Sequence, residues 1–398
     1  MINGKISDVC SNVYSGGTPN KKHDEYYVGG NIPWLNTSEI KFNRITATEK
    51  FITDEGYSAS SAKWVPANAV IVAMYGATAA RVAISKIPLT TNQACCNLII
   101  DDSKADYRYV YYWLCSRYTE LASLANGGAQ QNLNAGQIKD FPIALPHIDA
   151  QKKIADLLSA FDDKIEVNNE INENLLQQAS TIFKHWFTDN PSLDTLEQVP
   201  LADLCLVVTK GTTPTTLGKP FVSEGINFIK AESILDNHAI DKNKFAFIDS
   251  ETNDLLRRSI ISSGDIVFTI AGTLGRFALI DDSVLPANTN QAVAIIRANK
   301  SKVTPEYLYS FFLGNWHNDY YTKRIQQAVQ ANLSLGTIKS LPIPILSDKA
   351  MPEYLGIISP IITMTKANEL EITRLRTMRD ALLPQLMSGQ LDVSDLDL

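Results

Sequence analysis

Four groups of glycine and polar residues occur twice in this 398-residue chain, in the same order each time. The first copy has Gly16, Gly17 and Thr18, then Arg81, then Asn92 and Gln93, then Gln130, and the second has Gly211, Thr212 and Thr213, then Arg276, then Asn290 and Gln291, then Gln330. Arg, Asn and Gln side chains can form paired hydrogen bonds with base edges, and glycine turns let backbone N–H groups approach a phosphate. These residue types therefore predict contact with nucleic acid. The alternative is that they cap turns and satisfy buried backbone groups.

Signatures of catalysis are missing from the sequence. Gly211–Pro220 reads GTTPTTLGKP, which has the wrong glycine spacing for a phosphate-binding loop and a proline where the magnesium-binding hydroxyl should be. There is no GxSxG, HExxH or NPPY motif, and none of the five histidines recurs between the copies. The five cysteines are an odd set without a CxxC pair. We expect a non-catalytic chain with no metal or cofactor of its own.

The repeated groups belong to a duplication of a whole unit. Gln130–Ile143 (QQNLNAGQIKDFPI) and Gln330–Ile343 (QANLSLGTIKSLPI) are identical at eight of fourteen positions. Upstream, Val70–Arg81 (VIVAMYGATAAR) matches Ile266–Arg276 (IVFTIAGTLGR). A period of about 200 residues is too long for a solenoid and indicates two related domains.

Each copy first forms a globular domain, which we expect at residues 1–146 and 197–346. Short β-branched runs at 69–74 and 265–271 predict buried strands, and the amphipathic stretches 107–124 and 306–325 predict helices. The glycine segments after both strand runs lead into further β-type residues, so they predict hairpin turns. The expected fold class is α+β, a tandem duplication of two mixed α/β domains.

A long helix follows each domain, at 147–190 and within 347–398. In the first, no Pro or Gly occurs from Gln151 to Phe187, and Pro360 is expected to kink the second or mark its first turn. The predicted coiled-coil seams are Leu158, Phe161, Ile165, Asn168, Asn172 and Leu175 in the first helix, and Ile361, Met364, Asn368, Leu375, Met378 and Leu382 in the second. Their polar centres cost stability but fix register and partner. Antiparallel pairing of the two helices predicts a dumbbell with a pseudo-two-fold axis.

The net charge of -7 is unevenly distributed. Residues 1–146 have 13 Lys and Arg against 12 Asp and Glu, and residues 197–346 have 14 of each, so both domains are near neutral. Residues 147–196 and 347–398 are acidic, at -5 and -3. Because nucleic-acid-binding proteins are usually basic, this charge argues mildly against nucleic acid as a partner. The start lacks a secretory pattern and no stretch suits a membrane span, which predicts a cytoplasmic protein.

Several segments resemble the specificity (S) subunits of type I restriction–modification enzymes. The resemblance lies in LPHIDAQKKIADLLSAFDDKIEVNNEINENL (145–175), IFKHWF (182–187), LRTMRDALLPQLMSGQLDV (375–393), GGTP near the start of the first domain, and GDIVFTIAGTLGR (264–276). It covers essentially the whole chain. The first copy departs from the family in having Ala79-Ala80 before Arg81 instead of a single glycine.

This resemblance implies that each domain is a target recognition domain for one half of an asymmetric, split site in double-stranded DNA. It implies that the helices act as a spacer and dock two methyltransferase (M) subunits of an adenine-specific enzyme, and that restriction (R) subunits complete a defence against foreign DNA. S-adenosylmethionine, ATP and Mg would then be bound by the partner subunits. The alternatives are a DNA-modifying enzyme with an unrecognised site, a coiled-coil adaptor that binds no DNA, and the specificity subunit of a methylation-only system.

Overall fold

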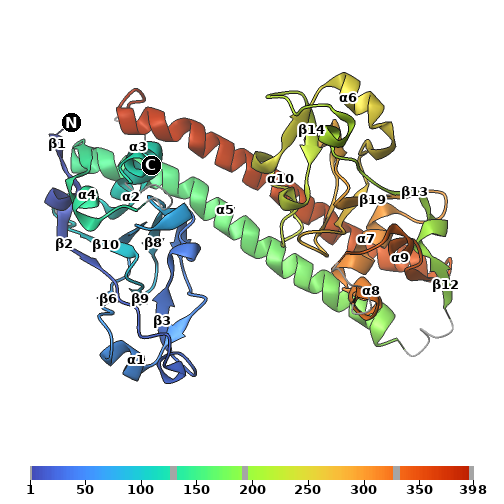
Figure 1. Ribbon diagram of the computed structural model, residues 1–398, viewed down its shortest axis with the longest axis horizontal. Coiled ribbons are helices and arrows are strands. Elements are labelled where there is room, and N and C mark those ends of the chain that lie inside the picture. Colours follow the sequence, from blue (N-terminus) through green and yellow to red (C-terminus); the bar gives the residue numbers. More distant parts are fainter. Residues whose placement is uncertain (1, 126–131, 191–195, 326–331, 394–398) are drawn as a thin grey trace. The chain divides into compact units, whose positions relative to one another are not determined.

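The computed structural model describes residues 2–125, 132–190, 196–325 and 332–393 (Figure 1). The chain divides into unit 1, Met1–Lys164 with Leu375–Leu398, and unit 2, Ile165–Arg374. This division differs from the predicted boundaries at 146 and 346, because one half of each long helix belongs to each unit. No described helix is long and apolar enough to cross a membrane.

The described residues of unit 1 form three sheets. The main one has the order β2-β10-β7-β8-β4, formed by Cys10–Ser15, Cys95–Ile100, Val70–Ala73, Val82–Ser85 and Asn43–Ile45. A second has the order β5-β3-β9-β6, formed by Phe51–Ile52, Ile32–Leu35, Leu89–Thr91 and Trp64–Val65. The third pairs β1 (Ile2–Lys5) with β11 (Pro142–Leu145). Strands β7 and β8 pair antiparallel, which confirms the predicted hairpin.

Unit 2 repeats this plan. Its main sheet has the order β13-β19-β16-β17, formed by Cys205–Lys210, Val293–Ala298, Ile266–Thr269 and Phe277–Leu279. The others are β15-β14-β18, formed by Ala246–Ile248, Ile226–Ile229 and Ala287–Thr289, and the pair β12 (Glu197–Pro200) with β20 (Pro342–Ile345). The tandem duplication of mixed α/β domains is thus confirmed, and β16–β17 is the second predicted hairpin.

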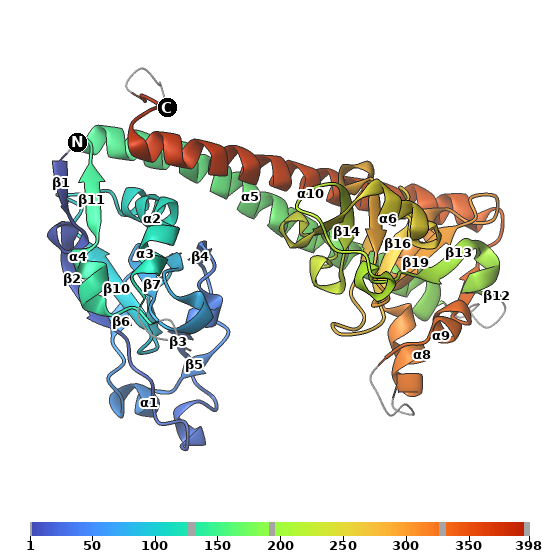
Figure 2. The ribbon, with the colours of Figure 1, turned by 45° about the horizontal axis from the view of Figure 1, so that its top comes forward.

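Short helices occur at matching places in the chain order of the two units (Figure 2). They are α2 (Tyr107–Ser116), α3 (Tyr118–Ser123) and α4 (Ala135–Asp140) in unit 1, and α7 (Pro305–Leu313), α8 (Trp316–Ile325) and α9 (Leu335–Lys339) in unit 2. The smaller α1 (Asp54–Ser58) and α6 (Ser250–Leu255) precede β6 and β16. Each predicted amphipathic stretch is therefore two helices with a break between them.

The same side chains tie helix to sheet in the two units. The Tyr109 hydroxyl of α2 donates to the Ala144 carbonyl at 2.9 Å, and the Tyr307 hydroxyl of α7 donates to the Pro344 carbonyl at 2.7 Å. Both rings are buried in the core between sheet and helix. These contacts explain why tyrosine recurs at one position of the predicted helix in both copies.

The two long helices are α5 (Ile148–Phe183) and α10 (Ala350–Ser388). In unit 2 they run antiparallel, because Asn168 contacts Glu371 while Asn172, one turn later, contacts Asn368, one turn earlier. Pro360 lies inside α10 rather than in its first turn, since the helix starts at Ala350.

The predicted seam fits α5 better than α10. Leu158, Ile165, Asn168 and Asn172 are buried, and Phe161 and Leu175 are partly buried. In α10, Ile361, Asn368, Leu375 and Leu382 are also partly buried. Met364 and Met378 are 53% and 52% exposed, so the prediction is wrong at these two residues. The buried stripe of α10 instead contains Ile358, Ile362, Thr365 and Ile372. The apolar pattern failed to predict this stripe because it contains a threonine, while two methionines lie on the exposed side.

Candidate nucleic-acid interface

The repeated residue groups of unit 1 meet at one end of its main sheet. Gly16–Thr18 follow β2, Asn92-Gln93 precede β10, and the segment 74–81 joins β7 to β8. Since these strands are antiparallel neighbours, all three connections lie at the same end of the sheet. Backbone hydrogen bonds join them: Met74 N donates to the Ala94 carbonyl at 2.8 Å, and Leu133 N to the Met74 carbonyl at 2.8 Å.

Unit 2 assembles the corresponding groups in the same way. Gly211 follows β13, Asn290-Gln291 precede β19, and the segment 270–276 joins β16 to β17. Ile270 N donates to the Ala292 carbonyl at 2.8 Å, and Leu333 N to the Ile270 carbonyl at 3.0 Å. Motifs far apart in the sequence thus form one composite site per unit. Gln130 and Gln330, the last predicted group, lie outside the described residues.

The glycines have a packing role in the structure. Gly16 N donates to the Cys95 carbonyl, Gly17 N to the Thr91 carbonyl at 2.9 Å, and Gly211 N to the Asn290 carbonyl at 3.1 Å. A Cβ at Gly16 would lie 2.1 Å from the Thr91 oxygen, and one at Gly211 only 1.8 Å from the Thr289 oxygen. These N–H groups donate to backbone carbonyls in the structure, and contact of the three glycines with a phosphate stays a prediction.

Both asparagines stabilise the turn in which they lie. Asn92 Oδ1 accepts from Ala94 N, and Asn290 Oδ1 accepts from Ala292 N, each at 3.1 Å. Asn92 Nδ2 also donates to Asn36 Oδ1 at 3.3 Å. This is the turn-capping alternative considered from the sequence, and it leaves the glutamine that follows each asparagine as the more accessible amide.

Gln93 and Gln291 are exposed at the tips of these turns. A threonine supports each one from the glycine turn. Gln93 N donates to Thr18 Oγ1 at 3.5 Å, and the Thr213 hydroxyl donates to Gln291 Oε1. Thr212 is partly buried beside Thr213. A glutamine amide has a donor and an acceptor in the geometry that pairs with an adenine edge.

The two predicted arginines differ in environment. Within the described residues, the Arg81 guanidinium forms no hydrogen bond or ion pair. Arg276 instead donates from Nε and Nη2 to the Asp236 carboxylate at 2.6 and 2.7 Å, and from Nη1 to the Ile234 carbonyl at 3.2 Å. A guanidinium can bind a guanine edge or a phosphate through two of its N–H groups. Those of Arg276 in unit 2 already donate to Asp236, whereas those of Arg81 in unit 1 are available.

The structure adds residues that the repeat comparison missed. Tyr75, 44% exposed, lies in the β7–β8 connection and bridges to Asn132. Trp64 is 45% exposed, and its carbonyl accepts from the Tyr14 hydroxyl at 2.7 Å. The Lys63 ammonium lies 5.6 Å from the Tyr14 ring centroid, and burial raises the pKa of the Tyr14 phenol, which keeps it neutral. A search for residues shared by both copies could not find these side chains.

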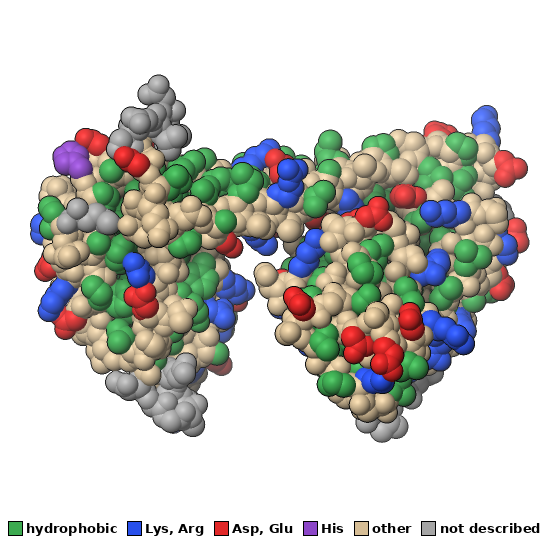
Figure 3. Space-filling model, turned by 90° about the horizontal axis from the view of Figure 1, so that it is seen from above, with side chains coloured by type: hydrophobic (Ala, Val, Ile, Leu, Met, Phe, Trp, Pro, Cys, Tyr) green, Lys and Arg blue, Asp and Glu red, His purple; other side chains and the backbone are tan. Residues whose placement is uncertain are grey.

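The charge of each unit is mixed rather than concentrated. On the face of unit 2 seen in Figure 3, Lys and Arg side chains lie among Asp and Glu side chains. The ion pairs of unit 2 include Arg297 with Asp265 and Lys219 with Glu251, each at 2.7 Å. Within the described part of the chain, no group of three or more His, Cys, Asp or Glu is arranged to hold a metal ion.

Known proteins are similar to this chain over both of its repeated halves. A family model described as the type I restriction modification DNA specificity domain matches residues 3–177 and 194–374. The chain is 26% identical over 410 residues to the type I restriction enzyme MjaIX specificity subunit of Methanocaldococcus jannaschii, covering 98% of this chain and 94% of that protein. It is 29% identical over 167 residues to the type I restriction enzyme EcoR124I/EcoR124II specificity subunit of Escherichia coli, covering 41% of this chain and 40% of that protein.

A solved structure shares the fold. The type I restriction–modification system S subunit from M. genitalium matches with a TM-score of 0.60 and 16% identity, over 97% of this chain and 95% of that one. Two mixed α/β domains, each followed by a long helix and each with the same composite site, define a duplicated two-domain protein. The chain belongs to the family of type I restriction–modification DNA specificity domains.

Proposed function

We propose that this chain is the sequence-specific DNA-recognition subunit of a type I restriction–modification complex, and that each unit reads one half of a two-part target. The observation that carries this proposal is the assembly of the same composite site at the same end of two related sheets. Two readers in one chain suit two half-sites. Because each mismatch costs ~1–3 kcal/mol roughly additively, a split target also multiplies discrimination.

The two halves of the target differ in sequence. Between Ile40 and Trp64, unit 1 has β4, β5 and α1, whereas the corresponding 234–260 of unit 2 has the 3-10 turn Lys242–Lys244, β15 and α6. The arginine fork is available in unit 1 and paired in unit 2. Readers with different loops and different accessible donors favour an asymmetric target.

The helices are the spacer and the docking surface for two methyltransferase subunits. Apolar side chains on their exposed sides support this assignment, among them Val167, Met364 and Leu370 at 47%, 53% and 48% exposure. Restriction subunits complete the nuclease. The chain itself is non-catalytic and cytoplasmic, and S-adenosylmethionine, ATP and Mg are bound by its partners.

Sequencing of base modifications in the host genome, with and without this gene, tests the proposal. We expect the loss of one methyladenine motif made of two short halves around a fixed gap. Retention of every motif, in a host where the chain co-purifies with an active methyltransferase subunit, would contradict it. If unmethylated phage DNA is not cleaved in the same host, the system is a methylation-only one.

Gln93 and Gln291 offer a matched pair for assigning the halves. Substitution of Gln93 by Ala should relax one half of the methylated motif and leave the other unchanged, and Gln291→Ala should do the reverse. If either substitution altered both halves, or neither did, these glutamines would not be the residues that read bases.

A further inference from the structure

Helices α5 and α10 have the same pattern of buried positions, 200 residues apart. Leu158 and Ile358 are both 0% exposed, and Ile165 and Thr365 are both 6% exposed. Each of these buried positions of α5 therefore has a counterpart in α10 whose number is 200 higher. We call the region where α5, α10 and the globular domain meet within a unit its helix junction. The correspondence lets the junctions of unit 1 and unit 2 be compared residue by residue.

At one matched position the chemistry differs. In unit 1, Asp162 is 8% exposed, and its Oδ1 accepts from Arg379 Nη1 at 2.5 Å. Its other oxygen accepts from the Tyr112 hydroxyl at 2.5 Å. The counterparts in unit 2 are Ile362 for Asp162 and Ala179 for Arg379, at 4% and 0% exposure. At these two positions unit 1 has an ion pair, with the Asp162 and Arg379 side chains 11% and 22% exposed, and unit 2 has two buried apolar residues.

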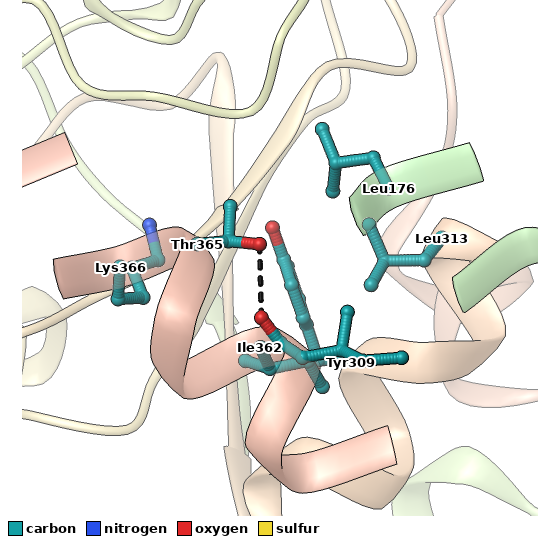
Figure 4. Close-up of a pocket in the computed structure, with 7 residues that line it drawn as sticks. Leu176, Tyr309, Leu313, Ile362, Thr365 and Lys366 are labelled. Carbon is teal, nitrogen blue, oxygen red and sulfur yellow. Dashed lines mark hydrogen bonds between the residues drawn. The ribbon is translucent and has the colours of Figure 1, made fainter. Parts of the chain in front are cut away.

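The junction in unit 2 shows that this position packs without a charge. A cavity of about 10 Å³, enough for one water, lies there between α5, α7 and α10. Figure 4 shows Leu176, Leu313 and Ile362 around it, with the Tyr309 ring between them. Only Thr365 and Lys366 add polar atoms to the lining besides the Tyr309 hydroxyl. An aliphatic side chain, Ile362, is therefore enough at the position that corresponds to Asp162. The nearby charge of Lys366 is paired within α10, with Glu369 at 2.7 Å.

A buried ion pair is a poor way to gain stability, because desolvation of the two charges offsets their attraction. Replacement of such a pair by well-packed apolar residues is often neutral or stabilising, whereas removal of one partner is strongly destabilising. The pair in unit 1 therefore distinguishes a correct partner from a wrong one better than it stabilises the correct one.

The wrong partner in question is the same helix of a second copy. In unit 1, Asp162 contacts Arg379, and their counterparts in unit 2, Ile362 and Ala179, belong to one hydrophobic core. If α5 packed on another α5 in the same antiparallel geometry, Asp162 would face Ala179. If α10 packed on another α10, Arg379 would face Ile362. The first arrangement leaves Asp162, which is 8% exposed, without its arginine. The second leaves Arg379 with only its ion pair to Asp380, the next residue of α10, at 2.8 Å.

We propose that the Asp162–Arg379 pair selects the helix partner: it makes α5 pair with α10 and rejects the pairing of either helix with itself in a second copy of this chain. Two similar helices in one chain need such a device. The consequence of this selection rests on the proposed function: each assembly has one unit 1 and one unit 2, and therefore one asymmetric target. Self-pairing would join two copies of the same reader and produce a symmetric target.

Co-expression of two full-length copies with different affinity tags tests this selection. The variant Asp162→Ile/Arg379→Ala gives unit 1 the residues of unit 2, and Tyr112→Phe removes the hydroxyl that would lose its acceptor. We expect the triple variant to melt at or above the wild-type temperature. Protein that carries both tags should increase about tenfold or more, since an unpaired buried charge disfavours the wrong pair by at least that factor.

Charge reversal is the matched control. Asp162→Arg alone places two guanidinium groups together and should lower the melting temperature, and Asp162→Arg/Arg379→Asp should restore it without mixed-tag protein. The proposal is overturned if the triple variant fails to fold, if it stays as free of mixed-tag protein as the wild type, or if the double reversal is no better than the single one. The assay contains no DNA, so its failure and that of the proposed recognition function are separate results.

Discussion

At the level of single residues, two glycines of unit 2 should respond oppositely to an added methyl group. In Gly211→Ala the new Cβ would lie 1.8 Å from the Thr289 oxygen, and we expect a loss of about 2–3 kcal/mol in unfolding free energy. A methyl group added at Gly356, within α10, would meet no heavy atom of a neighbouring element within 4 Å, so Gly356→Ala should stabilise by about 0.5–1 kcal/mol. Thermal and urea melts of both variants measure this, and equal effects would contradict the packing role of Gly211.

Arg81 and Arg276 should separate binding from stability. Because the Arg81 guanidinium has no partner among the described residues, Arg81→Ala should leave the melting temperature unchanged. It should weaken DNA binding by the methyltransferase-bound complex by about 1–3 kcal/mol. Arg276→Ala removes a fork already bound to Asp236 and should weaken binding less. Fluorescence anisotropy on the mapped target compares them, and the reverse order would show that Asp236 releases Arg276 to DNA.

His317 should make the stability of the chain depend on pH. Its imidazole is 2% exposed among Phe268, Phe277 and Phe312, and burial lowers its pKa to about 4. The unfolded state takes up the proton first, so stability is fully present above pH ~6.5 and is lost as pH falls toward 4, at up to ~1.4 kcal/mol per pH unit. Urea melts from pH 4.5 to 7.5 should show a smaller slope for His317→Phe. The exposed His147→Ala is the control, and a slope unchanged in His317→Phe would exclude His317 as the cause.

Residue roles at the composite site were only partly predictable. The repeat comparison located the turns, because residues needed for a turn survive duplication. It could not separate Asn92, whose side chain is used within the turn, from Gln93, whose side chain is exposed, since both recur. It also could not find the Arg276–Asp236 pair, because Asp236 lies 40 residues away in the sequence.

At the level of elements, α10 shows where periodicity fails. The strands and hairpins were predictable because their apolar runs are short, β-branched and bounded by turn residues. In α10, Thr365 is buried and Met364 is exposed, so the apolar pattern does not follow the packing. Polar contacts decide the register there, such as Asn172 Oδ1 accepting from Asn368 Nδ2 at 2.8 Å, and these depend on a helix nearly 200 residues away.

Neighbouring residues of α10 should therefore differ sharply on substitution. Met364 is 53% exposed, and Met364→Gln should change unfolding free energy by less than about 0.5 kcal/mol. Ile362 is 4% exposed, and Ile362→Ala should cost about 2–4 kcal/mol. Urea melts of the chain alone measure both. A large loss for Met364→Gln would restore the seam expected from the sequence.

At the level of the whole molecule, the duplication was the most predictable feature, and the division into units the least. The repeat boundary suggested that each domain ends where its helix begins. In the structure, Leu158 of α5 and Leu386 of α10 share one core with the sheet of unit 1. The second half of each long helix thus belongs to the unit that does not contain the preceding domain, and no local sequence pattern indicates this.

The charge of the chain predicts that tight DNA binding requires partner subunits. The net charge is -7, and several arginines are committed to carboxylates, including Arg44 with Asp163, Arg108 with Asp106, and Arg379 with Asp162. The net negative charge opposes the replacement of counterions on DNA, and this replacement supplies most of the affinity. We therefore expect the purified chain to bind its mapped target no better than micromolar, roughly the range of non-specific binding at physiological salt.

Addition of methyltransferase subunits should tighten this binding by several orders of magnitude, toward the ~10⁻⁸ M typical of specific complexes, and should steepen its salt dependence because the added phosphate contacts belong to the partners. Anisotropy titrations at several salt concentrations, on the target and on a scrambled duplex, measure both quantities. Tight, salt-resistant and specific binding by the chain alone would show that the two composite sites suffice. In that case the methyltransferase subunits would add chemistry to a DNA complex that the chain had already formed.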